Sequence, residues 1–246
     1  MRILVVAPTR REAQAIGRGA VAGASATAVA SLLDVASLDR AGAVLVVAGV
    51  CGGLDPSLAP GSIIIARGVS NADGVDLAPS PRLLDAAQHV LRARRRAFVS
   101  SRLLTVEAPV SSRRAKTELW NTHGAGGVDM ETYPLALAAE QRQIPWIAIR
   151  AVLDPASASL PASLRAWRAD TDEQAIMAEA RRRPWEWPAF ARLAMQMRTA
   201  SASLRTALDV VLPALNGLGR ADVAPAADLS IPLVAVGTAP SANGAS

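Results

Sequence analysis

The sequence predicts a three-layer α/β/α domain, in which helices cover both faces of a mixed but mostly parallel central sheet. Two observations predict this fold class. Short runs of β-branched and other apolar residues recur along the chain, and segments with helical spacing lie between them. Strands that are apolar on both faces are typical of parallel sheets buried between helices. The chain has 246 residues, of which 51% are hydrophobic, and it can therefore build a substantial core.

The expected strands are apolar runs with at most one charged residue. They comprise residues 3–7, 43–49, 63–66, 127–130 and 146–152. Pro8 ends the first of them, and Pro145 immediately precedes the last. The small-residue segment GVCGGL, residues 49–54, follows the second run and is expected to form a turn, because glycine permits tight chain reversals.

Helices are expected between and after these strands. Thr9 is a candidate N-cap, with Glu12 three residues later as in a capping box. Helical spacing is also found in residues 83–94, 131–142 and 190–212. We expect residues 1–216 to form a single domain, with 161–216 as its helical C-terminal part. Residues 217–246 are rich in Ala, Gly, Pro and Ser, and are expected to be a poorly ordered tail.

The charge balance is basic, with 26 Lys and Arg against 21 Asp and Glu. Nearly all of the cations are arginines, and Lys116 is the single lysine. The arginine clusters at residues 92–96 and 181–183 are not surrounded by a DNA- or RNA-binding motif, so no nucleic-acid partner is expected. A basic face that meets anionic lipid or phosphate is favoured instead.

Cysteine usage and hydropathy predict a cytoplasmic protein. The single cysteine, Cys51, excludes an intrachain disulfide and fits a reducing compartment. The first residues do not form a signal peptide, and no apolar run reaches the roughly 18 residues that a transmembrane helix needs. No metal site is expected, because His89 and His123 are isolated.

Two acidic residues are expected at one edge of the sheet. Glu131 begins a helix, and Asp154 follows a strand; helix amino ends and strand carboxyl ends share an edge in a parallel α/β unit. The same edge is expected to hold Arg10, Arg11, Glu12 and the segment 49–54. Each feature also has a simpler interpretation. Glu131 suits a helix dipole, Asp154 suits a turn before Pro155, and the glycines suit a turn without a ligand.

Four segments of the chain resemble the nucleoside phosphorylase and nucleosidase superfamily. They are the first strand with Glu12, GVCGGLDPSLAPGSIIIA, VDMETYPLALAA and IPWIAIRAVLDPAS, which together cover most of residues 1–157. Within that superfamily the chain is most similar to the hopanoid-associated phosphorylases, which also have an RRPW-like segment before a long helix. Here that segment reads RRRPWEWPAFARLAMQMRTA. Such enzymes are associated with removing adenine from adenosylhopane, a lipid-linked nucleoside.

The resemblance implies roles for the matching residues. Asp154 would be the general acid or hydrogen-bond partner at purine N7. Glu131 would accept hydrogen bonds from the ribose hydroxyls, Met130 would pack on the sugar, and Arg150 would hold the carboxylates of the site. Gly52, Ala108 and Val110 complete the expected substrate site.

The nucleophile is left open between phosphate and water. In nucleosidases the residue that matches Glu12 helps to activate water. In phosphorylases, arginines and backbone amides hold phosphate, which implies this role for Arg10, Arg11, Gly49 and Val50. Val50 occupies a position where many members have serine. Phosphorolysis, with inorganic phosphate as co-substrate and no further cofactor, is the leading expectation. A hydrolytic nucleosidase of the methylthioadenosine/adenosylhomocysteine type and a non-catalytic nucleoside-binding module are the alternatives.

The C-terminal part carries an apolar and basic surface with two interpretations. Its large apolar residues are Trp167, Trp185, Trp187, Phe190, Leu193 and Met197, with arginines nearby. The favoured interpretation is a helix packed on the sheet or on a second subunit. The other is a lipid-facing helix, with peripheral contact to the inner membrane. A homo-oligomer is expected, because superfamily members usually assemble.

Overall fold

The computed structural model describes residues 2–7, 12–14, 17, 21–22, 43–166, 178–179 and 181–218. The predicted cap Thr9, the arginines Arg10 and Arg11, Trp167 and most of the predicted tail lie outside these residues. Within them, no helix is both long and apolar enough to cross a bilayer.

The centre of the molecule is an eight-stranded sheet that contains all of the predicted strands. Its strands are β1 Arg2–Ala7, β2 Val21–Ala22, β3 Ala43–Gly53, β4 Ile63–Ser70, β5 Asp76–Leu77, β6 Val99–Thr105, β7 Gly127–Asp129 and β8 Trp146–Asp154. Strands β2, β5 and β6 were not predicted. The order is β2-β1-β3-β7-β6-β4-β5, and β8 pairs with both β3 and β4.

The sheet is mixed and partly closed. Parallel pairs join β1 to β2 and β3, β3 to β8, and β6 to β4 and β7. Antiparallel pairs join β3 to β7, β4 to β5, and β4 to β8. The pairings close a ring through β3, β8, β4, β6 and β7. Because β7 is antiparallel to β3, the idea that all these carboxyl ends share one edge is wrong. Strands β7 and β8 instead both pair with Gly52, near the end of β3.

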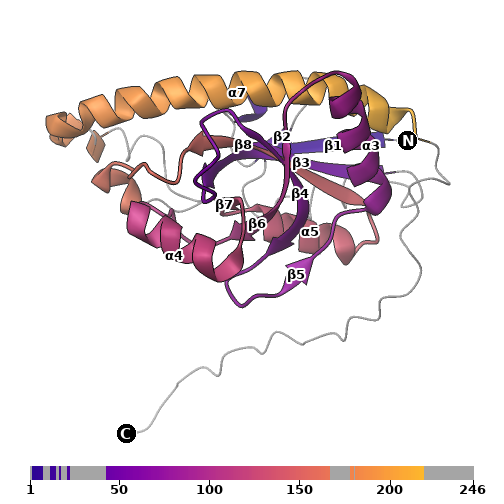
Figure 1. Ribbon diagram of the computed structural model, residues 1–246, viewed down its shortest axis with the longest axis horizontal. Helices are drawn as coiled ribbons and strands as arrows, with labels where there is room; N and C mark the ends of the chain where they lie inside the picture. The colour runs from indigo at the N-terminus through magenta and orange to yellow at the C-terminus, as the bar shows by residue number, and fades with distance from the viewer. Residues whose placement is uncertain are drawn as a thin grey trace, which may run out of the picture.

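Helices cover both faces, as predicted. The helices are α3 Pro81–Ala93, α4 Arg113–His123, α5 Thr132–Glu140 and α7 Trp187–Asn216, with 3-10 turns η2 Ala162–Ala166 and η3 Pro184–Glu186. Alternate residues of β3 point to opposite sides of the sheet. Val44 and Val46 join the core under α3 and α7, whereas Leu45 and Val47 join the core over α5. Figure 1 shows α7 above the sheet and α5 below it.

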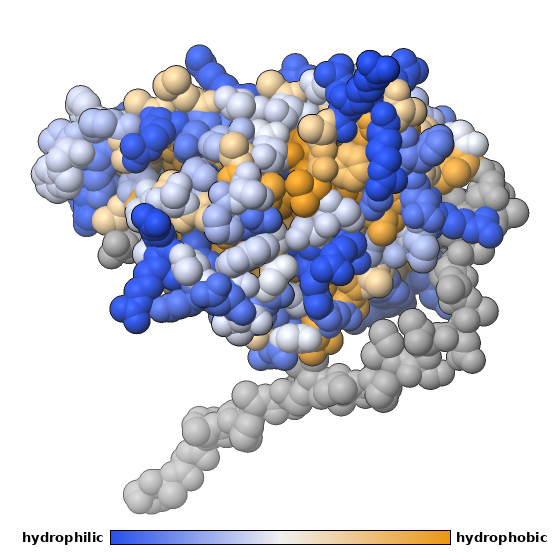
Figure 2. Space-filling view, viewed as in Figure 1, coloured by the Kyte–Doolittle hydropathy of each residue, from blue (hydrophilic) through white to orange (hydrophobic). Residues whose placement is uncertain are grey.

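The two halves of α7 differ in burial. The second half packs on the core through Ala200, Leu204, Ala207, Leu208, Val211 and Leu215. This spacing of three and four residues places them on one helix face. Residues 187–199 contain no buried residue. In Figure 2, which has α7 along the top, hydrophobic residues gather near the middle of the face and are interrupted by hydrophilic ones. The favoured interpretation of this helix, packing on the sheet, therefore holds for its second half.

The segment GVCGGL is not the predicted turn, because β3 continues to Gly53. Gly52 pairs with Val128 of β7 and with Asp154 of β8, and the β3–β8 register shifts between Cys51 and Gly52. A Cβ on Gly52 would lie 3.2 Å from Val128 Cγ1 and 3.6 Å from Asp154 Oδ1. The missing side chain lets three strands approach one another closely at this point, where the candidate site lies.

Candidate active site

Glu12 joins the start of the chain to the glycine segment of β3. Residues 12–14 are helical, and the Glu12 side chain is only 6% exposed. Its Oε1 accepts a hydrogen bond of 2.8 Å from the backbone N–H of Val50. The carboxylate of Glu12 is therefore placed at the point where β3 enters the site.

Arg150 is a buried cation on β8, held by residues of β7 and α5. Its Nη2 forms a 2.9 Å ion pair with Asp129 Oδ2, and its Nε and Nη2 donate to Thr132 Oγ1 at 3.0 and 2.6 Å. The Thr132 hydroxyl in turn donates to Asp129. Burial lowers the pKa of Arg150, but Asp129, Glu131 and Glu12 together raise it above its ordinary value. The guanidinium is thus permanently charged and lies among the carboxylates of Asp129, Glu131 and Glu12.

One nitrogen of Arg150 remains for a ligand. Nη1 is buried and has no hydrogen-bond partner among the described residues. A buried guanidinium nitrogen without an acceptor is unfavourable. An anion or a water molecule that binds beside the carboxylate cluster would satisfy it.

Glu131 is the N-cap residue of α5 and belongs to the same cluster. Its Oε2 accepts a 3.3 Å hydrogen bond from the backbone N–H of Met130. Burial, together with the nearby carboxylate of Asp129, raises the pKa of Glu131 to about 7, although Arg150 opposes the shift. Glu131 therefore changes charge close to neutral pH, and this is not explained by a helix-dipole role alone.

Asp154, at the end of β8, forms a second charged group with Lys116 of α4. Asp154 is 3% exposed and Lys116 is wholly buried. Lys116 Nζ is paired with Asp154 Oδ2 and also donates to the carbonyl of Pro155 at 2.9 Å. Burial raises the pKa of Asp154 above its ordinary value, and the charge and hydrogen bond of Lys116 oppose that shift.

Cys51 of β3 lies between the two charged groups. Burial raises the pKa of its thiol far above the ordinary value, and Arg150, Asp129, Asp154 and Lys116 all lie near enough to affect it. The thiol is therefore protonated and packs as an apolar side chain. Both groups of charges consequently line the same few residues of β3.

The remaining predicted residues are placed as follows. Gly49 is buried and Val50 half-buried in β3, and Met130 is half-buried between Asp129 and Glu131. Val110 packs beside Val128 and Leu54 in a small core cluster, and half-buried Ala108 lies in the same loop after β6. The structure thus brings Glu12, Glu131, Arg150 and Asp154 to the glycine segment. It leaves Arg10 and Arg11 undescribed.

Three residues of the site were missed from the sequence: Asp129, Thr132 and Lys116. Asp129 and Thr132 flank the Met130–Glu131 pair in VDMET, and the resemblance assigns roles to that pair alone. Asp129 also accepts a 2.8 Å hydrogen bond from Thr105 of β6. The only signal for Lys116 was that it is the single lysine in a chain otherwise rich in arginine.

The architecture is shared with solved nucleosidases. A mutant of futalosine hydrolase from Helicobacter pylori matches with a TM-score of 0.65 at 13% identity, over 87% of this chain and 99% of its own. A methylthioadenosine/adenosylhomocysteine nucleosidase of the same organism gives 0.64 at 13%, over 87% and 98%. The nucleosidase of Neisseria meningitidis gives 0.62 at 16%, over 86% and 98%. At these identities the likeness shows a common fold.

The family follows from the sequence comparison. No curated protein matches the chain significantly in sequence. The model of the phosphorylase superfamily, however, matches residues 15–183, which is well over half of the chain and includes most of the site. The protein therefore belongs to the phosphorylase superfamily, whose enzymes include nucleoside phosphorylases and nucleosidases.

Proposed function

We propose that the protein cleaves the N-glycosidic bond of a purine nucleoside, with Asp154 as the acid at N7 and Glu131 as the acceptor for the ribose hydroxyls. The observation that carries the proposal is the position of these carboxyl groups on either side of β3. Gly52 pairs with Asp154 on one side and with Val128, three residues before Glu131, on the other. Burial raises the pKa of both carboxyl groups.

This arrangement suits the chemistry of the bond. When it breaks, the ribose becomes electron-poor and the base must leave with an electron pair. A protonated Asp154 donates to N7, so that the base departs neutral, and a positioned acid of this kind contributes roughly 10²–10⁴-fold. An ionised Glu131 accepts from two adjacent hydroxyls and stabilises the developing positive charge of the sugar.

We propose phosphate as the nucleophile, which makes the enzyme a transferase that forms a sugar 1-phosphate. Buried Arg150 Nη1 is a donor without a protein acceptor in the described part of the chain, and phosphate oxygens would accept from it. Arg10 and Arg11 immediately precede Glu12 in the sequence, and Glu12 contacts the backbone N–H of Val50, the residue after Gly49. Inorganic phosphate is then a co-substrate, and the proposed chemistry needs no other cofactor.

Hydrolysis is the second candidate, and one contact favours it. The N–H of Val50, a proposed phosphate ligand, is already donated to Glu12 Oε1 at 2.8 Å. A carboxylate at this position repels phosphate and can take a proton from water instead. The similar solved structures described above are themselves hydrolases.

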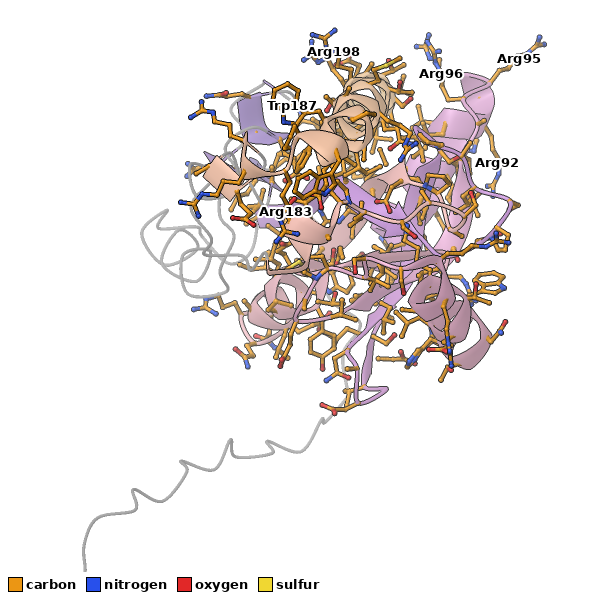
Figure 3. All side chains as sticks on the ribbon, turned by 90° about the vertical axis from the view of Figure 1, so that its left-hand side faces the viewer. Arg92, Arg95, Arg96, Arg183, Trp187 and Arg198 are labelled. Atoms are coloured by element: carbon orange, nitrogen blue, oxygen red, sulfur yellow. The ribbon has the colours of Figure 1, made fainter. Side chains whose placement is uncertain are left out.

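The proposed substrate is lipid-linked, with adenosylhopane as the leading candidate from the family resemblance. Support comes from residues 181–198, termed here the Trp–Arg segment, where Trp185 is 72% and Met195 69% exposed. Figure 3 shows Arg183 and Trp187 of this segment, with Arg198 pointing away from the protein. Exposed indole and thioether groups among arginines suit an anionic bilayer surface.

The Trp–Arg segment lies toward the end of the molecule at which β1, β3 and β8 finish. In Figure 1 the chain starts on the right with β1, and α7 starts on the left. Strand β3 is parallel to β1, and β8 is parallel to β3, so all three end toward the left. We therefore propose that the protein contacts the inner membrane at the end that holds the site. From the family resemblance we also propose that it is a cytoplasmic homo-oligomer.

The test is base release from adenosine, methylthioadenosine and adenosylhopane, each with and without phosphate, followed by chromatography. Phosphate-dependent release of adenine with a ribose 1-phosphate product is the expected result. Release without phosphate would replace phosphorolysis with hydrolysis and give Glu12 the role of activating water. No release from any of the three would contradict the proposed cleavage of adenine nucleosides.

Membrane contact gives a separate prediction. Replacing Trp185 and Met195 with alanine should lower the affinity for anionic phospholipid vesicles, measured by co-sedimentation, about tenfold or more. The reason is that alanine buries much less apolar surface in the bilayer than either side chain. Val75→Ala, a change at another exposed apolar residue, is the matched control and should bind like the wild type. Equal binding by all three proteins would contradict the contact.

A further inference from the structure

Lys116 is the only buried residue of α4. Ser112 caps this helix, accepting a 3.2 Å hydrogen bond from the N–H of Ala115, and Gly124 ends it in the left-handed conformation. Two apolar side chains of the helix, Leu119 and Trp120, are half-buried and pack against a small core cluster. The one side chain that the helix buries completely is that of Lys116, and its ammonium group lies against Asp154.

Stability does not explain this lysine. Removing two charges from water is unfavourable, and replacing a buried ion pair with apolar residues of similar volume is often neutral or stabilising. An apolar side chain at position 116 would fill the same space without that penalty. A functional reason for the ammonium is therefore favoured.

The pair divides the two oxygens of Asp154. Lys116 is bound to Oδ2, and its second bond, of 2.9 Å to the Pro155 carbonyl, fixes the ammonium itself. The other oxygen, Oδ1, faces Gly52, since it lies 3.6 Å from where a Cβ on that glycine would be. One oxygen is thus held by the protein, while the other is directed to the glycine segment where the nucleoside is proposed to bind.

We propose that Lys116 is a positioning residue that holds Asp154 by Oδ2 and stabilises the carboxylate left when Oδ1 gives its proton to the purine. This inference rests on the proposed function. In the step, the Oδ1–H bond breaks and an N7–H bond forms. The electron pair of the C1′–N9 bond goes to the base, which leaves neutral, and a phosphate oxygen bonds to C1′. The proton that hydrogen phosphate loses returns to Asp154 through solvent.

The electrostatics fit this role. Burial favours the protonated acid at rest, and the ammonium favours the carboxylate formed by proton transfer. Of the charged groups in the described residues, Lys116 is the one that shifts the pKa of Asp154, and Cys51 lies close to both. Lys116 thereby limits how far burial raises the pKa of Asp154, so that Asp154 can still give up its proton.

The kinetic test compares Lys116→Met with Lys116→Arg. We expect Lys116→Met to lower kcat about 10- to 100-fold with little change in KM, because the acid becomes weaker and less well placed. The protonated acid is the active form, so activity falls as pH rises through its pKa. Without the cation that pKa is higher, and the alkaline limb should move up by about 1–3 pH units. Lys116→Arg, which keeps the charge, should retain the wild-type limb.

Asp154→Asn supplies the matched background. In it, Lys116→Met should cause no further loss of rate, because the lysine acts only through Asp154. Additive losses, or an unshifted alkaline limb in Lys116→Met, would overturn the proposal. The double variant holds no buried charge at this pair and provides a folded reference if Lys116→Met alone is unstable.

A second readout does not require turnover. Because Lys116 is the single lysine, [ε-¹³C]lysine labelling of the full chain, without an added tag that contains lysine, gives one NMR signal from this site. The signal should move with pH as Asp154 ionises, and that movement should be absent in Asp154→Asn. If the wild type cleaves no nucleoside while this dependence is present, the proposed function fails and the pairing stands. If the signal is the same in both proteins, the role of Lys116 is refuted even in an active enzyme.

Discussion

Replacing Asp154 with asparagine is expected to lower the rate of base release by about 10²–10⁴-fold, the contribution of a positioned general acid. Asparagine has the same shape, but its amide cannot transfer a proton to N7. The loss should therefore fall on kcat, with KM little changed. The measurement is steady-state release of base from whichever nucleoside the wild type prefers.

The single variant also affects folding at pH values where Asp154 of the wild type is ionised, because it leaves the ammonium of Lys116 buried without a carboxylate. Breaking a buried pair by removing one partner costs about 3–5 kcal/mol. The double variant Lys116→Met/Asp154→Asn removes both charges, so we expect it to regain most of the thermal stability and none of the activity. A double variant that is stable and turns over at the wild-type rate would exclude Asp154 as the acid.

The sequence predicted the strands of the sheet well, because buried strands need continuous apolar runs. It did not predict β6, whose sequence VSSRLLT begins with four residues that are exposed or half-buried, three of them polar. The sequence also did not predict that β7 runs antiparallel to β3. Strand β7 has only three residues, and its pairing with β3 involves Gly52 and Gly53. Propensity along the chain holds no information about such distant pairings.

Helix α4 was missed for a physical reason. A surface helix is recognised by its apolar stripe, but the one buried residue of α4 is a lysine. Its end signals, Ser112 and Gly124, are present in the sequence and would have located it without the stripe. The Lys116–Asp154 pair joins residues 38 positions apart, and no spacing rule connects them.

The candidate site was predictable to the extent that its residues follow or precede strands. Asp154 pairs with Gly52 of the glycine segment, and Glu131 lies beside Arg150 and Glu12. The parallel-edge reasoning that placed them together was wrong, because β7 is antiparallel to β3. Asp129 and Thr132 could not be assigned, because their task is to hold Arg150, and that network exists only once β7, β8 and α5 are packed.

Glu131→Gln is expected to change how stability and activity depend on pH. Burial raises the pKa of Glu131 from 4.5 to about 7, so the folded protein binds this proton more tightly than the unfolded chain does. The resulting stability is fully present below pH 4.5 and is lost as pH rises through 7. Over that interval the free energy of unfolding of the wild type should fall by about 3 kcal/mol relative to Glu131→Gln, whose amide does not titrate.

Ionisation of Glu131 should also control catalysis, but activity should rise with pH where stability falls. Only the carboxylate accepts hydrogen bonds from both ribose hydroxyls, so wild-type kcat/KM should rise with pH through about 7. Glu131→Gln should be nearly inactive at every pH, although it is the more stable protein above pH 7. Denaturant unfolding and initial rates, each measured from pH 5 to 9, would test both effects on one set of samples. The exposed Glu118 provides the control, since Glu118→Gln should leave both profiles unchanged. If the stability of Glu131→Gln follows the wild-type pH profile, the carboxyl is not protonated in the folded site, and the acid limb of activity must be assigned to another group.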